Sequence, residues 1–398
     1  MVQARQFSGK IACWGNGDQG RLGLGTAGGS AVPCLVGALM DACFAGVSCG
    51  GAHTAAVAED GSAYLWGLND RGQLAQGDET PFLQVPREAL VPEAIVQVAC
   101  GSRHTLFLSD SHCVWAAGDN RRGQLGLGKQ LSGNQALPRR VQALVGTKIT
   151  SITAGAEHSM AVSDSGELFT WGNGTRGCLG HGVSAAGYHE DEHAPRLVRS
   201  LAGRHITFAA AGLANSGCID QNGTAYLWGP LLRQSLGSTA SEVDRPEPVQ
   251  GVQHAVQLAI GGCHALIQKH NGAVASYGAN EYGVLGHGSD PTSKGMYPVD
   301  IKDIRFEQVA CGWRHNAGVE NGRLWAWGWG GSVGSDSAVF PQHTSSGGQL
   351  GLGNEFDYWK PTAVQDLVDE EQKSLPASSW GAMSVSCGLN HTAALIKL

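Results

Sequence analysis

The stretch HTAAVAEDGSAYLWG, residues 53–67, decides the fold. It places two apolar runs on either side of Asp-Gly, a pattern that predicts two antiparallel strands joined by a tight turn. Related units occur as HSMAVSDSGELFTWG (158–172) and HNAGVENGRLWAWG (315–328). The separation from the first residue of the unit to its final glycine is 14 residues, or 13 in the last unit. This constancy predicts a rigid hairpin that repeats along the chain.

Two short signatures frame each hairpin, and each occurs seven times. The first ends the hairpin, at Trp14-Gly15, Trp66-Gly67, Ala117-Gly118, Trp171-Gly172, Trp228-Gly229, Tyr277-Gly278 and Trp327-Gly328. The second begins it, at CGGAHT (49–54), CGSRHT (100–105), AGAEHS (154–159), AGLANS (211–216), IGGCHA (260–265), CGWRHN (311–316) and CGLNHT (387–392). Histidine holds one position in six copies, and Asn215 replaces it in the fourth. Repeats of about this length are typical of propellers and solenoids.

The last repeat lacks its second strand, and the beginning of the chain supplies one. The sequence ends at HTAALIKL and begins with GKIACWG at residues 9–15. We expect residues 392–396 to pair with residues 11–14, which closes the ring and leaves no open edge. The sequence therefore predicts an all-β fold, a single seven-bladed β-propeller over residues 1–398. Loop insertions are expected near residues 183–194, 331–347 and 369–383.

Composition narrows the class of protein. The chain has 398 residues, 59 of them glycine, only 15% charged residues and a net charge of −7. No Lys/Arg-rich block is present to neutralise phosphates, so direct nucleic-acid binding is not expected. Eleven cysteines without a CxxC pair favour a reducing compartment. We expect no membrane span and an intracellular protein, cytoplasmic or nuclear, with an organelle or a cilium left open.

The motifs resemble the regulator of chromosome condensation repeat family. WGNGDQGRLGLG (14–25), AGDNRRGQLGLG (117–128) and WGNGTRGCLGHG (171–182) fit its WGxxxxGxLGxG pattern, and CGxxHT recurs in register. The family includes an exchange factor for a Ran-type small GTPase, a plant ultraviolet-B sensor and several adaptors. The resemblance implies a surface that binds proteins, because one fold hosts many activities.

Motifs that suggest chemistry have structural explanations here. GxGxxG occurs at 15–20 and 172–177, but RLGLG and CLGHG follow where a nucleotide site needs a helix. HEDEH (189–193) has the HExxH pattern of zinc proteases but lies in a predicted acidic loop without a surrounding amphipathic segment. The repeated histidines are expected to bond neighbouring backbone groups. We therefore expect no enzyme activity, cofactor, metal or small-molecule substrate.

Binding residues are expected where equivalent positions of the repeats differ. The third and fourth positions after the repeat glycine are variable and point the same way in every blade. Their arginines should form an arc over four successive repeats that contacts an acidic partner: Arg71, Arg121, Arg122, Arg176 and Arg233. Solvated charges are the alternative.

Two further contacts are expected around the sixth repeat. Trp313 and Arg314 are this repeat's own variation within a turn whose Cys311 and His315 belong to the scaffold. SVGSDSAVFPQHTSS is an insertion in the loop after Gly328, and Phe340 is its apolar candidate contact.

Three functions follow from these expectations. An adaptor or regulatory subunit that binds a protein is the first. A guanine-nucleotide exchange factor for a Ran-like or other small GTPase is the alternative, although the basic tail of the chromatin-binding relative is missing. Photoreception is third, because the tryptophans of the light sensor's three turns correspond to Leu213, Gly262 and Trp313 here.

Overall fold

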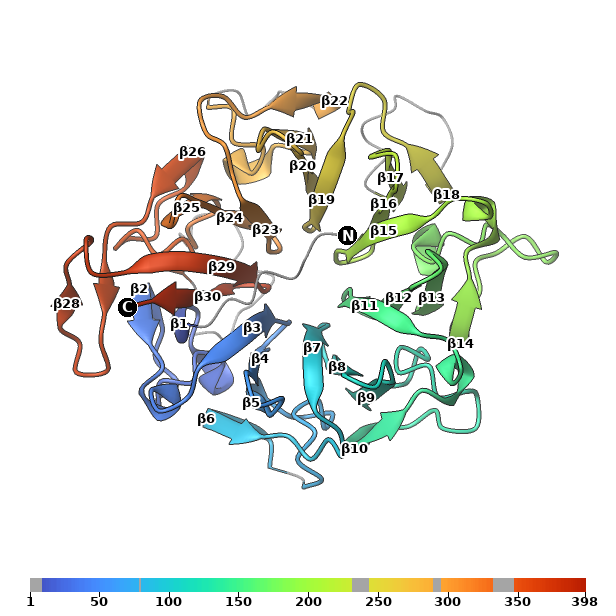
Figure 1. Cartoon of the computed structure of the whole chain (residues 1–398), viewed down its shortest axis with the longest axis horizontal. Coiled ribbons are helices and arrows are strands. Elements are labelled where there is room, and N and C mark those ends of the chain that lie inside the picture. The colour runs from blue at the N-terminus through green and yellow to red at the C-terminus, as the bar shows by residue number, and fades with distance from the viewer. Residues whose placement is uncertain (1–8, 79, 231–242, 289–294, 332–346) are drawn as a thin grey trace.

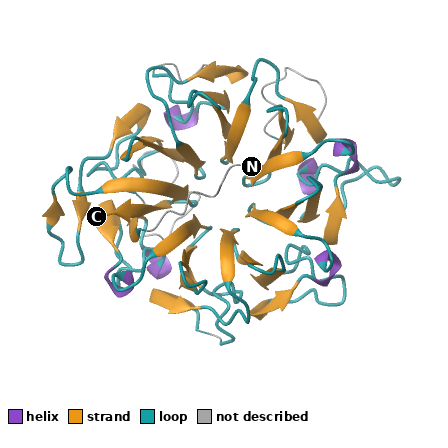
Figure 2. Ribbon diagram, in the orientation of Figure 1, coloured by secondary structure: helices purple, strands orange, loops and turns teal. Residues whose placement is uncertain are grey.

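Seven β-sheets surround a central axis in the computed structural model, which describes residues 9–78, 80–230, 243–288, 295–331 and 347–398 (Figure 1). The first strand of each sheet points toward the axis, and the later strands lie progressively further out (Figure 2). The predicted seven-bladed β-propeller is confirmed. Within the described ranges, the helices are single short turns, and none has the length and apolarity needed to cross a membrane.

Six blades each consist of four consecutive antiparallel strands. Blade 1 has β3 (Phe44–Cys49), β4 (His53–Ala58), β5 (Ala63–Leu68) and β6 (Phe82–Glu88). Blade 2 has β7 (Ile95–Cys100), β8 (His104–Ser109), β9 (Val114–Gly118) and β10 (Gln135–Arg140). Blade 3 has β11 (Ile149–Ala154), β12 (His158–Ser163), β13 (Leu168–Gly172) and β14 (Glu192–Leu197).

The next three blades repeat this plan. Blade 4 has β15 (Ile206–Ala211), β16 (Ser216–Asp220), β17 (Ala225–Gly229) and β18 (Val243–Pro248). Blade 5 has β19 (Ala255–Ile260), β20 (His264–Lys269), β21 (Val274–Gly278) and β22 (Gly295–Asp300). Blade 6 has β23 (Gln308–Cys311), β24 (His315–Glu320), β25 (Arg323–Gly328) and β26 (Tyr358–Ala363).

Blade 7 joins the two ends of the chain. Its strand order is β29 (Gly381–Cys387), β30 (His391–Lys397), β1 (Lys10–Gly15), β2 (Ser30–Leu35), β27 (Leu367–Val368) and β28 (Ser374–Leu375). Trp14 lies opposite Thr392 and Ile11 opposite Leu395, so the predicted closure is confirmed. The region near 369–383 thus contributes a small hairpin, β27 and β28, to the outer edge of this blade (Figure 1).

Short 3-10 turns connect the strands at both ends of the blades. They are η1 (Asp18–Gly20), η2 (Gly37–Leu39), η3 (Gln142–Leu144), η4 (Thr175–Gly177), η5 (Arg199–Leu201) and η6 (Glu281–Gly283).

The strand register places both repeat signatures at one end of every blade. His53 lies opposite Gly67, and His158 lies opposite Gly172, so the turn before the histidine adjoins the loop after the glycine. We call this end of the propeller the motif face. The Asp-Gly type turns lie at the other end, which we call the hairpin face.

A ring of buried hydrogen bonds joins neighbouring blades. Each histidine Nε2 bonds a side chain at the start of the second strand of the next blade, at 2.6 to 3.0 Å. The pairs are His53–Thr105, His104–Ser159, His158–Ser216, His264–Asn316, His315–Thr392 and His391–Thr54. The expected structural role fits these contacts, but the expected backbone partners were wrong, because hydroxyl and amide side chains accept the bonds.

The hydroxyl groups fix the protonation of the ring histidines. Thr105 Oγ1 donates to the carbonyl of Gln73 at 2.8 Å, and Ser159 Oγ donates to that of Gln124 at 2.7 Å. Because a carbonyl only accepts, each hydroxyl oxygen is left to accept from the imidazole. His53 and His104 therefore carry a proton on Nε2, and burial, which lowers the pKa of both rings to about 3, keeps them neutral.

The same carbonyls hold the tryptophans of the repeat. Trp171 Nε1 donates to Gln124 O at 2.9 Å, and Trp14 Nε1 donates to Gln349 O at 3.0 Å. One loop carbonyl thus receives two side chains of the next blade. The conserved spacing of the signatures follows from this three-way contact across each of these junctions.

The glycine before each histidine is a steric requirement. A Cβ atom on Gly101 would lie 2.1 Å from Cε1 of His104, so any larger residue displaces the ring. The glycine and the histidine at this position are therefore one structural unit.

Candidate functional site

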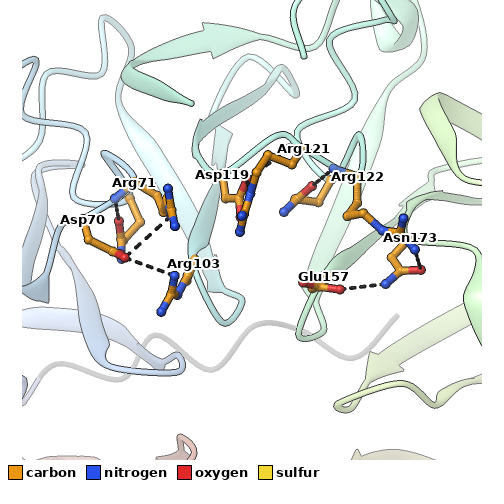
Figure 3. A network of polar contacts seen from close by, with 10 residues as sticks. Asp70, Arg71, Arg103, Asp119, Arg121, Arg122, Glu157 and Asn173 are labelled. Atoms are coloured by element: carbon orange, nitrogen blue, oxygen red, sulfur yellow. Dashed lines mark hydrogen bonds and ion pairs between the residues drawn. The ribbon is translucent and has the colours of Figure 1, made fainter. Parts of the chain in front are cut away.

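The variable arginines of blades 1 and 2 lie on the motif face within a network of polar contacts that extends to blade 3 (Figure 3). Asp70 is its first member, and its carboxylate lies 3.6 Å from Arg71 Nε and 3.1 Å from Arg103 Nη1. Arg71 belongs to the loop after Gly67, whereas Arg103 belongs to the turn before His104. The network therefore connects the two variable parts of adjacent blades.

Blade 2 contributes an arginine that is paired with a buried acid. Arg121 donates to both carboxylate oxygens of Asp119, from Nε to Oδ1 at 3.0 Å and from Nη2 to Oδ2 at 2.7 Å, and the Asp119 side chain is 3% exposed. Burial alone would raise the pKa of Asp119, but the hydrogen bonds and charge of Arg121 outweigh it and hold this pKa below its ordinary value. The carboxylate therefore stays charged and orients the guanidinium.

Arg122 carries the network into blade 3. It lies 3.1 Å from a carboxylate oxygen of Asp191 and donates to Asn173 Oδ1 at 3.0 Å. Asn173 in turn donates to Glu157 at 2.6 Å (Figure 3). Asp191 belongs to HEDEH, so this segment takes part in the motif face. No group of His, Cys, Asp and Glu within the described ranges is arranged to hold a metal ion.

The arc therefore presents matched charges. Arg71, Arg121 and Arg122 each face a carboxylate, so a partner meets alternating signs. Arg176 is exposed in η4, and it has no ion-pair partner among the residues that the structure describes. Arg233 lies outside the described residues.

An aromatic cluster occupies the motif face of blades 5 and 6. The Arg314 guanidinium lies 4.2 Å from the Trp313 ring centre and 5.1 Å from that of Tyr282. Its Nη1 donates to the Tyr282 hydroxyl at 3.2 Å. Trp329 packs against both rings, with centroids 6.3 Å from Trp313 and 6.0 Å from Tyr282. Trp313 and Arg314 are thus adjacent contacts in one cluster, while Phe340 lies outside the described residues.

The indole of Trp313 also explains a difference between blades. A Cβ atom on Gly262 would lie 2.5 Å from Trp313 Cδ1, so this indole lies across the turn of blade 5. Its aromatic neighbour is Trp329. The residues that correspond to the light sensor's other two turn tryptophans, Leu213 and Gly262, are not aromatic.

Sequence reasoning missed several members of this face. Asp119, Asp191 and Trp329 were not identified. Asp119 pairs with Arg121 within one loop, whereas Asp191 and Trp329 contact residues of the preceding blade. The sequence did contain a signal for Asp70 and Tyr282, because they occupy the same two variable positions after the repeat glycine as the arginines of the arc. It also contained one for Arg103, which lies at a variable position of the turn before His104.

The buried thiols and imidazoles on this face are unreactive, because their protonation does not change near neutral pH. Burial raises the pKa of the Cys100 and Cys387 thiols to about 12, so both stay protonated at neutral pH. Burial lowers the pKa of His104 and His315 to about 3. These groups stabilise the ring, and the exposed residues above them are the candidates for binding.

Comparisons with known proteins agree with this architecture. The ultraviolet-B receptor UVR8 of Arabidopsis thaliana is 32% identical over 91% of this chain and 79% of its own. The secretion-regulating guanine nucleotide exchange factor of Bos taurus is 28% identical over 98% of this chain and 83% of its own. The crystal structure of Prp20p from Saccharomyces cerevisiae superposes with a TM-score of 0.80, covers 99% of this chain and 92% of its own, and is 23% identical.

The family model for the RCC1-like domain matches residues 10–394, which is nearly the whole chain. Together with the seven-bladed ring and its repeated signatures, this match shows that the chain belongs to the family of RCC1-like domains.

Proposed function

We propose that the propeller is a protein-binding module and that its motif face contacts the partner. One observation carries this proposal: the repeated residues are buried in the ring, while the residues that differ between blades gather above it. Aromatic residues and arginine are the side chains that dominate binding energy at protein interfaces. An adaptor or a regulatory subunit needs such a surface and no catalytic group.

The two parts of the motif face suggest different contributions to binding. The paired charges of blades 1 to 3 favour a partner that carries both signs, because a uniformly acidic surface would meet Asp70, Asp119 and Asp191 as well. Charged pairs at the edge of an interface mainly steer association, whereas a packed aromatic cluster contributes more of the affinity. We therefore place the stronger contacts at Trp313 and Arg314.

Affinity purification with mass spectrometry tests this proposal. The wild-type chain is compared with the double variant Trp313→Ala and Arg314→Ala, and with Arg199→Ala as a matched control in η5 on the hairpin face. We expect the double variant to lose specific partners that the control retains. Equal recovery of every partner by all three chains would contradict a role of the motif face.

A guanine-nucleotide exchange factor is the second candidate. The full-length similarity to the secretion-regulating guanine nucleotide exchange factor supports it. Such a protein promotes GDP release through binding alone and needs no catalytic group of its own. Release of labelled GDP from a panel of small GTPases tests it, and the absence of any acceleration by the wild-type chain would remove this candidate.

A further inference from the structure

A second surface feature lies on the hairpin face, where blade 2 meets blade 3. It is a cavity of about 230 Å³. Its wall consists of the turn between β8 and β9, the end of β10 and the connection that leads to β11. The polar side chains that line it include Ser111, His112, Cys113, Arg140, Thr147 and Lys148.

The turn of this cavity departs from the repeat. Five other blades place glycine at the corresponding position, with φ between 75° and 88°: Gly61, Gly166, Gly223, Gly272 and Gly322. Blade 2 has His112 there, with φ of 64°. A side chain in this left-handed conformation is disfavoured relative to glycine, and such exceptions gather at functional sites. The exception brings an imidazole to the cavity.

Arg140, which also lines the cavity, is a second residue that differs from its counterparts in the other blades. It lies opposite Trp115 in the register of β9 and β10. The corresponding residues of blades 1, 3, 4, 5 and 6 are Glu88, Leu197, Pro248, Asp300 and Ala363. Among these six blades, only blade 2 therefore places a cation at this position.

The hydrogen bonds leave donors available to a ligand. Arg140 Nη2 donates to Cys113 Sγ at 2.6 Å, while its buried Nε has no partner among the described residues. His112 Nδ1 donates to the carbonyl of Ile149 at 2.9 Å, which fixes the ring and leaves Nε2 outside that bond.

Acidic and hydroxyl groups also lie next to the cavity. Lys148 Nζ lies 3.7 Å from Asp164 in an exposed pair, which is weak in water. Ser111 donates to Glu93 at 2.5 Å, so one carboxylate lies at the margin of the cavity. Three nitrogen-bearing side chains and the Thr147 hydroxyl remain on the cavity wall.

We propose that this cavity binds a phosphate group, either as inorganic phosphate or as a small phosphomonoester. Arg140 and Lys148 offer donors from two separate segments to an oxyanion with oxygens in several directions, and guanidinium is the preferred phosphate partner. Nε2 of the neutral His112 ring can accept a hydrogen bond from a P–OH group. The cavity is smaller than the roughly 300 to 1,000 Å³ that drug-sized ligands occupy, so the ligand is small. Leu144 and Val145 also line it and offer contact to a short apolar ester. This site lies on the face opposite to the proposed protein contact and does not depend on it.

Calorimetric titration of the whole chain tests the proposal, with inorganic phosphate and glycerol phosphate as probes and chloride at matched ionic strength as the blank. We expect saturable binding of at least one phosphate probe. Arg140→Gln should weaken it about tenfold or more, because it removes a charged hydrogen-bond donor. Lys129→Gln, an exposed lysine outside the cavity, is the matched control and should bind as the wild type does.

His112→Gly keeps the test valid if Arg140→Gln fails to fold. It restores the glycine of the other hairpins, so it should fold at least as well while it loses the imidazole and part of the affinity. Alkylation provides an independent reading: bound phosphate should slow the reaction of Cys113 with iodoacetamide but not that of the exposed Cys43.

Three outcomes would overturn the proposal. The first is no saturable binding beyond the chloride blank for either probe. The second is unchanged affinity in both Arg140→Gln and His112→Gly. The third is equal protection of Cys43 and Cys113, which would indicate a general effect of the anion.

Discussion

The junction between blades 4 and 5 differs from the junction between blades 6 and 7. At the latter, His315 Nε2 bonds Thr392 at 3.0 Å, and the backbone amide of Trp313 donates to Gly388 O at 3.3 Å. At the former, Ala265 replaces the hydroxyl residue, and Asn215 Nδ2 donates to the carbonyl of Gly262 at 3.0 Å. At the junction of blades 4 and 5, the Asn215 side-chain amide thus donates to a backbone carbonyl of the next blade. At the junction of blades 6 and 7, a backbone amide makes that kind of bond and a histidine side chain makes a second one.

This comparison shows that each junction keeps a side-chain hydrogen bond between neighbouring blades even where the residue types differ. Asn316 illustrates this point at the junction of blades 5 and 6. It accepts from His264 through Oδ1 and donates to Val284 O at 2.9 Å through Nδ2, so it replaces both functions of a threonine hydroxyl. Only where the acceptor is lost, at Ala265, is the histidine lost as well.

Acidification should break the six histidine junctions and spare only the asparagine one. Burial holds the pKa of His53, His104 and His315 at about 3 and that of His158 and His264 at about 4, against an ordinary 6.5. The unfolded chain therefore binds more protons between these values, so stability falls as the pH drops below about 6.5. Each histidine costs about 1 kcal/mol or more per pH unit.

Urea unfolding followed by circular dichroism at pH 7.5 and pH 5 measures this effect. Six such groups together exceed the usual margin of about 5 to 15 kcal/mol within one or two pH units. An equal free energy of unfolding at both pH values would contradict the neutral ring.

Removing one ring bond should cost more at a histidine junction than at the asparagine one. His315→Ala leaves a cavity and removes the N–H group from which the Thr392 hydroxyl accepts, and we expect a loss of about 3 kcal/mol. Asn215→Ala removes one hydrogen bond and should cost about 1 kcal/mol. The same urea titrations measure both variants, and equal losses would show that the junctions are equivalent.

The asparagine junction should accept the histidine pair only as a pair. Asn215→His alone directs an N–H group at the methyl of Ala265 and should destabilise the fold. Adding Ala265→Thr supplies the acceptor, so a double-mutant cycle should give a coupling energy of about 1 kcal/mol in favour of the pair. Additive effects of the two substitutions would indicate that the imidazole does not reach the threonine.

The smallest effect on stability is expected outside the ring, on the motif face. Arg71→Ala and Arg122→Ala each remove a half-exposed ion pair and should cost less than about 1 kcal/mol. Thermal unfolding measures these variants, and any captured partner provides the binding readout. A loss above about 2 kcal/mol would place these arginines with the scaffold.

The sequence was sufficient to predict the structural features that every blade shares. It was not sufficient to predict the contacts that differ from blade to blade. Fixed spacing between His53 and Gly67 reflects one register in every blade, so the hairpins, the ring and the pairing of Trp14 with Thr392 followed from it. The partners of the ring histidines lie one blade away, a relation that spacing within a single repeat does not contain. The acid beside Arg122, Asp191, comes from a loop of the next blade, so this contact emerged only from the three-dimensional arrangement.

The pairing of Lys10 with Ile396 has a consequence for synthesis on the ribosome. Chains grow by about 5 to 20 residues per second, so β1 waits roughly 20 to 80 s before β30 emerges to cover its edge. Contacts between such distant segments also make folding slow. Until that moment the nascent protein carries an apolar strand with an open edge, which is the surface that chaperones bind.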